Sequence, residues 1–284
     1  MSNENNLLSE YKSVGILMIA TNNYINRWKT VAQDLEDHAY KGIGSVTIHL
    51  FTNEIIAARD FAKNNLKRIN LMVHEVKAWG WPEATLLRYE FFSEASDQLN
   101  SDFLVYLDSD MRVVDDFGAI TKQLLSGKGI GVVRHPGYFI LNKWKRIKEY
   151  ISTPSLAISD IKLGLRNSGS LGAWETNKLS RAFVPRSLRR TYVHGAIWFG
   201  YRDDFLRLCK TLAENTRIDL EKGVIAKWHD ESHLNSFITK NRHKIFDNRL
   251  SFVFGYSQLE EYSNDYFISN VTKNPGEGRI PSNA

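Results

Sequence analysis

Two aspartates two positions apart are the first residues in the chain whose types and spacing could do chemistry. Asp108 and Asp110 flank Ser109 directly after the apolar run from Phe103 to Leu107. A hard divalent cation such as Mg²⁺ or Mn²⁺ takes oxygen ligands, commonly one or two carboxylates completed by water and substrate phosphates. Turns also favour Asp and Ser, so the triplet alone fits either a turn or a metal site. Its place after an expected strand favours the metal site.

A dense polar segment, Trp228 to Asn235, is the second candidate. Asp230 is expected to cap the helix that follows, because its carboxylate can accept backbone N–H bonds there. This leaves Glu231 as a carboxylate without a structural task. His229 and His233 are four residues apart, as in the zinc-protease pattern His-Glu-x-x-His, but the acidic residues are in the wrong places for it. A zinc hydrolase is therefore a remote alternative, and a structural role is favoured for His233.

The common glycine-rich phosphate loops are absent from the sequence. Neither Gly-x-x-x-x-Gly-Lys-Ser/Thr nor Gly-x-Gly-x-x-Gly occurs between a first strand and its helix. A nucleotide would therefore have to be held by side chains and by a metal that bridges its phosphates.

Alternating strands and helices in the first half would position these groups. Each expected strand is a short apolar run, and each expected helix has apolar residues at helical spacing. The expected strands are Val14–Ala20, Ser45–Phe51, Asn70–Val76 and Phe103–Leu107, and the expected helices are Ile25–His38, Glu54–Leu66 and Pro82–Leu99. This order predicts an α/β fold with a mostly parallel, Rossmann-like sheet flanked by helices. Ligands bind beyond the carboxyl ends of such strands, which places Ala20-Thr21 and Asp108 to Asp110 on one rim.

The second half has a different pattern. After a strand at Gly131–Val133, a loop-rich stretch is expected from Arg134 to Arg190, followed by helices at Arg202–Asn215 and Glu231–Lys240. A polar tail from about residue 265 is expected to be mobile. We expect residues 1–284 to form a single domain, with a nucleotide-sugar half at 1–133 and an acceptor half at 134–284.

Composition narrows the class of protein. The 284 residues are 43% hydrophobic and 24% charged, which is typical of a folded globular protein. The single cysteine, Cys209, excludes disulfides within the chain and multi-cysteine metal sites, and its apolar neighbours predict a core residue. No secretion signal or membrane span is present, so we expect a cytoplasmic protein. The net charge of +5 is spread along the chain and forms no dense basic block. We therefore expect no nucleic-acid partner, and at most peripheral contact with a membrane.

The segment from Trp228 to Asn235, together with the strand-end Asp-x-Asp, resembles the glycosyltransferase family of the ABO blood-group transferases and α1,3-galactosyltransferases. The similarity covers most of residues 14 to 281. It runs in order through Tyr24, Phe51-Thr52, the Trp81–Glu90 helix, Asp108 to Met111, His135 to Gly137, Tyr192 to Ala196 and Lys273-Asn274. The resemblance implies a GT-A fold. It also implies retaining transfer of a sugar from a UDP-sugar to a β-galactoside, which forms an α1,3 linkage in a cell-surface glycan or blood-group-like antigen.

The same resemblance assigns the donor site residue by residue. Ile19, Ala20, Thr21 and Tyr24 would hold the uridine, and Arg88 and Asp230 would orient the donor sugar. Asp108 and Asp110, with Ser109 between them, would ligate Mn²⁺ or Mg²⁺ against the diphosphate. Lys273 and Arg279 in the tail would close over that diphosphate once the donor is bound.

The resemblance also assigns the reacting centre and the acceptor site. Glu231 is the catalytic residue, either as a nucleophile or as a carboxylate that stabilises an oxocarbenium-like transition state and positions the acceptor. Trp228 and His135 would bind the acceptor, with the indole stacked on a sugar face. A carbohydrate-binding module with a degenerate site is the third alternative, but the intact Asp pair and Glu231 argue against it.

His194, Gly195 and Ala196 match the segment that discriminates between donors in the family. The methyl group of Ala196 limits the room beside the sugar's C2 substituent, which favours UDP-galactose, with UDP-N-acetylgalactosamine as the alternative. The vertebrate members carry an N-terminal membrane anchor that is not found in this sequence. We therefore expect a bacterial or phage-type relative that acts on an oligosaccharide or glycolipid acceptor. The segment Lys244–Phe254 departs from the family's acceptor pattern, which leaves open whether the acceptor is fucosylated.

Overall fold

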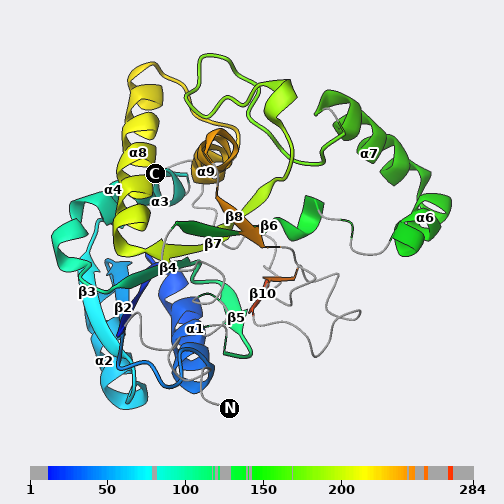
Figure 1. Ribbon diagram of the computed structural model, residues 1–284. Helices are drawn as coiled ribbons and strands as arrows, with labels where there is room; N and C mark the ends of the chain where they lie inside the picture. Colours follow the sequence, from blue (N-terminus) through cyan, green and yellow to red (C-terminus); the bar gives the residue numbers. More distant parts are fainter. Residues whose placement is uncertain are drawn as a thin grey trace, which may run out of the picture.

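A seven-stranded sheet forms the centre of the computed structural model (Figure 1). The structure describes residues 12–78, 82–116, 118, 121, 129–138, 140, 143–167, 169–241, 243–246, 253–254 and 268–270. In sheet order the strands are β3 (Asn70–Glu75), β2 (Ser45–Thr52), β1 (Ser13–Ile19), β4 (Phe103–Leu107), β7 (Val193–Tyr201), β6 (Ile130–Arg134) and β8 (Lys244–Phe246). β7 is antiparallel to both of its neighbours, and the other paired strands are parallel. The predicted mostly parallel α/β sheet is confirmed.

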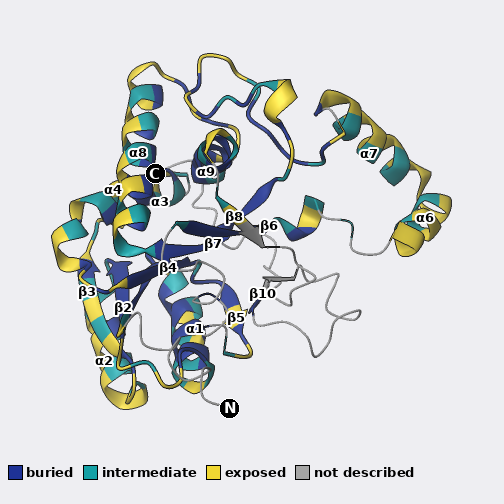
Figure 2. Ribbon diagram, in the orientation of Figure 1, coloured by how far each residue is buried: buried dark blue, intermediate teal, exposed yellow. Residues whose placement is uncertain are grey.

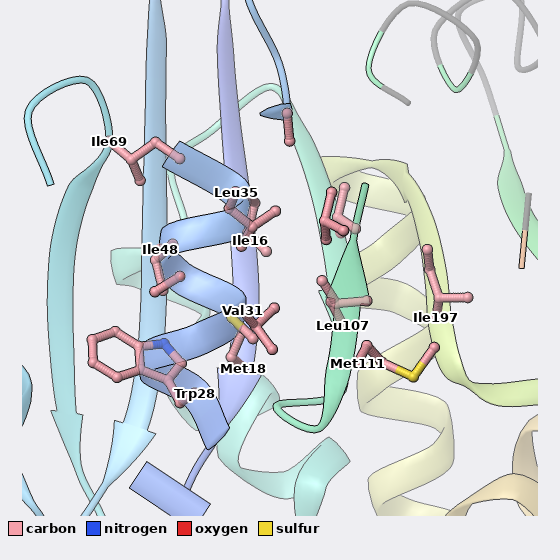
Figure 3. Close-up of a cluster of buried hydrophobic side chains, with 14 of the residues drawn as sticks. Ile16, Met18, Trp28, Val31, Leu35, Ile48, Ile69, Leu107, Met111 and Ile197 are labelled. Atoms are coloured by element: carbon pink, nitrogen blue, oxygen red, sulfur yellow. The ribbon is translucent and has the colours of Figure 1, made fainter. Parts of the chain in front are cut away.

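Two hydrophobic cores cover the two faces of this sheet. Strand β1 contributes to both, since Ile16 and Met18 lie in one core and Leu17 lies in the other. Figure 3 shows the first core, where Trp28 of helix α1 (Tyr24–His38) packs against the sheet. Side chains alternate between the faces of a strand, so a strand buried on both faces is a continuous apolar run. This is the pattern from which the sequence predicted the strand.

Helices flank the sheet on both sides. Those of the first half are α1, α2 (Ile55–Asn65), α3 (Glu83–Leu86) and α4 (Arg88–Glu94), followed by the 3₁₀ turn η2 (Ser96–Gln98). Those of the second half are α6 (Lys143–Ser152), α7 (Pro154–Arg166), α8 (Arg202–Glu221) and α9 (His229–Lys240), with 3₁₀ turns η3 (Pro136–Tyr138) and η4 (Arg186–Leu188). Cys209 on α8 is fully buried in the second core, as predicted. No helix among the described residues is long and apolar enough to span a bilayer.

Two expectations for the helices are wrong. The helix expected over Pro82–Leu99 is interrupted at Leu87, whose backbone (φ −94°, ψ 3°) leaves the helical region, so Arg88 begins a separate helix. The stretch from Arg134 to Arg190 contains α6 and α7 instead of loops alone. Pro154 does not interrupt a helix there, because it occupies the first turn of α7, where its missing N–H is tolerated.

A second, small sheet holds part of the chain's end. Its strands are β5 (Met111–Val113), β10 (Ile268–Asn270) and β9 (Val253–Phe254), with β10 in the centre. Ile268 pairs with Val113 and is fully buried, and Asn270 pairs with Met111. Residues 268–270 of the expected tail thus form a strand, and the predicted mobility of the tail stays a prediction.

Candidate active site

A cavity of about 420 Å³ opens at the carboxyl end of β4, where β4 and β7 are paired. Its wall combines residues from α3, α4 and η3 with Asp108 of the Asp pair and with the first four residues of the polar segment Trp228 to Asn235. The lining residues are Thr85, Arg88, Asp108, His135, Tyr138, His194, Gly195, Ala196, Trp228, His229, Asp230 and Glu231. Most of the residues that the sequence analysis assigned to the donor sugar, reacting centre and acceptor therefore meet in one place.

Arg88 connects three parts of the cavity wall. Its Nη1 atom lies 2.7 Å from Asp230 Oδ2 and donates to the Gly195 carbonyl oxygen at 3.1 Å, while Nη2 lies 3.2 Å from Asp108 Oδ1. Its guanidinium carbon also lies 4.3 Å from the centre of the Tyr106 ring. Burial opposes the charge, but Asp230, Tyr106 and Asp108 more than offset this effect, so the pKa of Arg88 is raised. Arg88 is thus a permanent cation that holds two carboxylates in place.

Glu231 lies against the backbone of β7. Its Oε2 atom accepts a hydrogen bond from the Gly195 N–H at 2.8 Å. A Cβ atom at position 195 would come within 3.1 Å of both Cβ and Oε2 of Glu231, so a side chain there would have to shift Glu231 by a few tenths of an ångström. One turn along α9, Asn235 exchanges two hydrogen bonds with the backbone of Val193, at 2.8 and 2.9 Å. These contacts fix the position of Glu231 beside β7.

Two carboxyl groups of the cavity have raised pKa values. Burial raises the pKa of Glu231 to about 7, although the Gly195 N–H and Tyr192 favour its ionised form. Burial also raises the pKa of Asp230 to about 6, against the opposing effect of Arg88. Carboxyl groups with such shifts are common at catalytic sites, because burial that disfavours charge also strengthens electrostatic effects on a substrate.

The start of α9 differs from the expected cap. The helix begins at His229, so Asp230 lies in its first turn, and no side chain caps the helix at Trp228. The predicted N-cap at Asp230 is therefore wrong, and the Asp230 carboxylate pairs with Arg88. His229 has a φ of 41°, a left-handed conformation that is unfavourable for a residue with a side chain. This backbone turn brings Trp228, His229 and Asp230 to the same cavity.

His229 and His233 do not converge on one site. His229 lines the cavity, with Nδ1 3.4 Å from the Thr85 hydroxyl. His233 is buried, with Nε2 3.6 Å from Asp219 Oδ2 on α8, and burial lowers its pKa to about 4. Within the described residues, no group of three or more His, Cys, Asp or Glu side chains is placed to hold a metal ion. The interpretation of His233 as a structural residue is in keeping with this arrangement.

The Asp pair supplies two carboxylates at the end of β4. Asp108 lines the cavity, and its side chain is 30% exposed. Its Oδ1 atom accepts hydrogen bonds from Arg88 and from the Tyr106 hydroxyl. Asp110 is buried and is not part of the cavity lining. This donor set fits a hard divalent cation that takes one or two protein carboxylates and completes its shell with substrate phosphate and water.

Aromatic rings and imidazoles form the other side of the cavity. Trp228 is 48% exposed, so much of its indole is open to solvent. The His135 ring contacts those of Tyr138 and His194, with centroids 4.7 and 4.8 Å apart. His135 Nδ1 accepts a hydrogen bond from the Gly137 N–H at 3.0 Å, and burial lowers its pKa to about 4. The neutral ring therefore carries its proton on Nε2, which makes it a hydrogen-bond donor.

The residues assigned to uridine lie on the predicted rim but outside the cavity lining. β1 and β4 are parallel neighbours, with Leu17 opposite Tyr106, so Ala20-Thr21 and Asp108 leave the sheet at the same edge. Four of the assigned residues follow or end β1: Ile19, Ala20, Thr21 and Tyr24. Ser109 is buried beside the Asp pair. Lys273 and Arg279 fall outside the described residues.

Three lining residues were not assigned to the donor or acceptor site from the sequence: Thr85, Tyr138 and His229. Tyr138 follows the His135-Pro136-Gly137 segment directly, so its neighbours were a usable signal. Thr85 is three residues before Arg88 and had no comparable signal, because the helix break at Leu87 determines where it lies.

Comparisons with known proteins find glycosyltransferases that are similar to this chain. A model of glycosyltransferase family 6 matches residues 167–252, which include both β7 and the start of α9. The chain is 26% identical over 196 residues to the O-antigen biosynthesis glycosyltransferase WbnI of Escherichia coli, which covers 69% of this chain and 71% of the relative.

Vertebrate proteins are similar over a longer part of the chain. Identity is 24% over 230 residues with histo-blood group ABO system transferase 2 of Rattus norvegicus, or 80% of this chain and 59% of the relative. Identity is also 24% over 238 residues with globoside alpha-1,3-N-acetylgalactosaminyltransferase 1 of Gallus gallus, which is 82% of this chain and 60% of the relative. The chain thus spans about three fifths of the length of these vertebrate relatives. The family match, these relatives and the α/β fold together support a glycosyltransferase that resembles glycosyltransferase family 6.

Proposed function

We propose that the chain transfers galactose from UDP-galactose to a β-galactoside acceptor, with retention and with formation of an α1,3 linkage. One observation carries the proposal: a single cavity brings together Arg88, Asp108 and the adjacent pair Asp230 and Glu231, from three separate parts of the chain. The relatives are named for O-antigen synthesis and for blood-group or globoside transfer, which supports a cell-surface glycan or blood-group-like product.

The donor would be held by residues from both halves of the chain. The uridine would lie on the rim at Ile19 to Tyr24, and the sugar would lie beside the Arg88–Asp230 ion pair. Asp108 and Asp110 would hold Mn²⁺ or Mg²⁺, which when bound would neutralise the charge of the leaving diphosphate. We treat residues 1–284 as one domain with a donor half at 1–133 and an acceptor half at 134–284, because the cavity draws its wall from both.

Glu231 would act at the reacting carbon. The bond between the donor's C1 and the β-phosphate oxygen breaks, its electron pair leaves with UDP, and a new bond forms between C1 and O3 of the acceptor. The acceptor's hydroxyl proton passes to the departing phosphate. The Glu231 carboxylate either forms a transient bond to C1 or stabilises its developing positive charge, and both roles require the ionised form.

The acceptor would enter from the aromatic side. Trp228, with its partly exposed indole, would stack on a sugar face, and His135 Nε2–H would donate to an acceptor hydroxyl. At the donor end, Ala196 is buried in the cavity wall beside Gly195 and limits the room near the C2 substituent. This contact favours galactose over N-acetylgalactosamine.

The basic residues Lys273 and Arg279 would close over the diphosphate. Support comes from β10, where Asn270 pairs with Met111, the residue that follows Asp110. The described chain therefore returns to the segment of the Asp pair three positions before Lys273 in the sequence.

A test is to measure UDP release from UDP-galactose and from UDP-N-acetylgalactosamine, with Mn²⁺ or EDTA, over lactose and 2'-fucosyllactose. We expect release that requires Mn²⁺ and prefers UDP-galactose, and comparison of the two acceptors establishes whether the acceptor is fucosylated. Linkage analysis of the product and its anomeric NMR coupling would establish the α1,3 bond and the retention. An inverted product would overturn the proposed mechanism, and a preference for UDP-N-acetylgalactosamine would overturn the donor assignment.

A further inference from the structure

Two helices, α6 and α7, carry apolar side chains on their outer surface. None of their residues, all of which lie in the described part of the chain, is buried. Figure 2 shows the pair at the edge of the molecule, coloured as exposed or intermediate. Six large apolar side chains on the two helices are between 45% and 78% exposed: Trp144, Ile147, Ile151, Ile158, Ile161 and Leu165.

These apolar residues form one stripe on each helix. In α6 they occupy positions i, i+3 and i+7 from Trp144, and in α7 they occupy the same positions from Ile158. Residues at this spacing share one helix face. The apolar face that usually packs into a protein core is therefore turned outward on both helices.

A polar seam holds the two helices together on their other side. Arg146 on α6 lies 2.7 Å from Asp160 on α7 and 3.0 Å from Glu149, and the Tyr150 hydroxyl donates to Asp160 at 2.7 Å. Arg146 and Asp160 each follow the first residue of a stripe by two positions, or about 200° around the helix. The seam thus faces away from the stripes and leaves them accessible.

Positive charge flanks the stripes. Residues 143–166 contain six basic and two acidic residues, a formal charge of +4, whereas the whole chain has +5. Both acidic residues, Glu149 and Asp160, are paired with Arg146. Lys148 and Lys162 are exposed and lie four residues after Trp144 and Ile158, directly beside the stripes. The pair therefore combines apolar anchors with flanking cations.

We propose that α6 and α7 dock on an anionic lipid surface, with the apolar stripes at the headgroup boundary and the flanking lysines on lipid phosphates. Exposed Trp and Ile beside Lys on an amphipathic helix are the side chains that suit this boundary. Charge complementarity selects an anionic lipid surface over a neutral one. The inference goes beyond the proposed reaction and does not depend on it.

Helices α6 and α7 are joined to the rest of the chain close to the cavity, so docking on a membrane would also position the cavity. At the end of α7, Arg189 donates to the Arg166 carbonyl at 3.2 Å and to Asn167 Oδ1 at 2.9 Å. At the other end, α6 begins five residues after Tyr138, which lines the cavity. Docking would thus hold the cavity near a membrane, where a lipid-linked acceptor would be found.

Vesicle binding by the full chain tests the proposal. Cys209 is buried, so a cysteine introduced by Ile151→Cys or Ile161→Cys can carry an environment-sensitive fluorophore. The matched control is Ile56→Cys on α2, because Ile56 and Ile151 are both 77% exposed. With vesicles of equal parts phosphatidylglycerol and phosphatidylcholine, we expect a blue shift at position 151 or 161 and none at 56. Raising the salt concentration to about 0.5 M should reduce this blue shift, because salt screens the attraction between the lysines and the lipid phosphates.

A charge variant completes the test. Replacing Lys143, Lys148 and Lys162 with Gln should weaken binding to the anionic vesicles by roughly fivefold per residue, or about a hundredfold together. The matched control replaces Arg59, Lys63 and Lys67 of the α2 region with Gln and should change binding much less. Both variants should keep the wild-type melting temperature and UDP release with a soluble acceptor.

Several outcomes would overturn the inference. They are an absence of any vesicle-dependent shift, equal binding to pure phosphatidylcholine, or an equal loss in the two charge variants. A shift at position 151 that grows with protein concentration without vesicles would instead assign the stripes to a second copy of the chain. Loss of UDP release with intact vesicle binding would count against the proposed reaction only.

Discussion

The guanidinium of Arg88 lies 2.7 Å from the carboxylate of Asp230, and the same group lies 3.2 Å from Asp108. The first carboxylate belongs to the start of α9 and the second to the end of β4. Arg88 thus fixes the distance between the proposed sugar-binding side chain and the proposed metal ligand. A group that is buried and bonded to several partners cannot be removed without leaving those partners uncompensated.

Replacing Arg88 should affect both stability and activity. Arg88→Met removes the cation at similar volume and leaves Asp230 buried without its counterion, which should cost about 3–5 kcal/mol in the free energy of unfolding. UDP release should fall by at least about a hundredfold, because the donor sugar loses its orientation. Denaturant unfolding and initial rates measure the two effects. The double variant with Asp230→Asn should regain much of the stability and none of the activity, and wild-type stability of the single variant would contradict this account.

Glu231→Gln should separate activity from stability. The amide keeps the shape and can still accept the Gly195 hydrogen bond, but it cannot act as a nucleophile or stabilise a positive charge. We expect transfer to fall by about a thousandfold or more. At neutral pH the variant should be more stable than the wild type by roughly 1–2 kcal/mol, because it no longer buries an ionised carboxylate. A destabilised Glu231→Gln variant would contradict the cost assigned to this carboxylate.

The same shift predicts how stability depends on pH. The pKa of Glu231 is raised in the folded protein from its usual 4.5 to about 7, so the folded state binds this proton more tightly than the unfolded state. The resulting stabilisation is complete below the lower value and is lost as the pH rises through about 7. The melting-temperature difference between Glu231→Gln and the wild type should therefore grow across this window, and a constant difference would count against the shift.

Activity should depend on pH in the opposite sense. In the proposed reaction Glu231 acts in its ionised form, so kcat/KM should fall as the pH drops below about 7, and more steeply below about 6, where Asp230 also takes up a proton. The two carboxyl groups lie in one cavity, so the profile reports apparent values for the pair. Measurement with the donor below its KM gives the free enzyme's profile. A flat profile down to about pH 5 would exclude an essential ionised Glu231.

The sequence predicted those strands that are marked by a short apolar run. The strands before the rim are continuous apolar runs, so their positions and the placement of Asp108 at a strand end followed from the sequence. The role of Arg88 did not, because its partners come from β7 and α9 and only the tertiary fold brings them together. Its identification depended on the family resemblance.

The errors in the second half have a physical explanation as well. Helices α6 and α7 have apolar residues at helical spacing, but these face outward among basic residues, which resembled a loop with interleaved charges. The antiparallel strand β7 was not expected, because alternating helices and strands predict only parallel neighbours. Asp230 is not the N-cap residue because the helix begins one residue earlier, at His229.

Loss of either member of the Asp pair should weaken metal binding and remove most of the activity. Asp108→Asn and Asp110→Asn each keep the shape but lose the charge that a hard cation requires. We expect each to lower UDP release by at least about a hundredfold and to raise the Mn²⁺ concentration needed for half-activity. Isothermal titration of Mn²⁺ in the presence of UDP gives a readout apart from turnover. Full EDTA-resistant activity in either variant would rule out the assigned ligands.

Enlarging the pocket at Ala196 should relax the choice of donor. Ala196 is buried in the cavity wall, and its backbone oxygen accepts a hydrogen bond from the Asp108 N–H at 2.9 Å, so Ala196→Gly should leave that contact in place. Removing one methyl group should raise kcat/KM for UDP-N-acetylgalactosamine relative to UDP-galactose by roughly tenfold, the usual scale for a methylene-sized change in a pocket. Ala182→Gly, at an equally small buried residue outside the cavity lining, is the matched control and should leave the ratio unchanged. Competition between the two donors in one reaction measures the ratio directly, and an unchanged ratio in Ala196→Gly would remove this residue from donor selection.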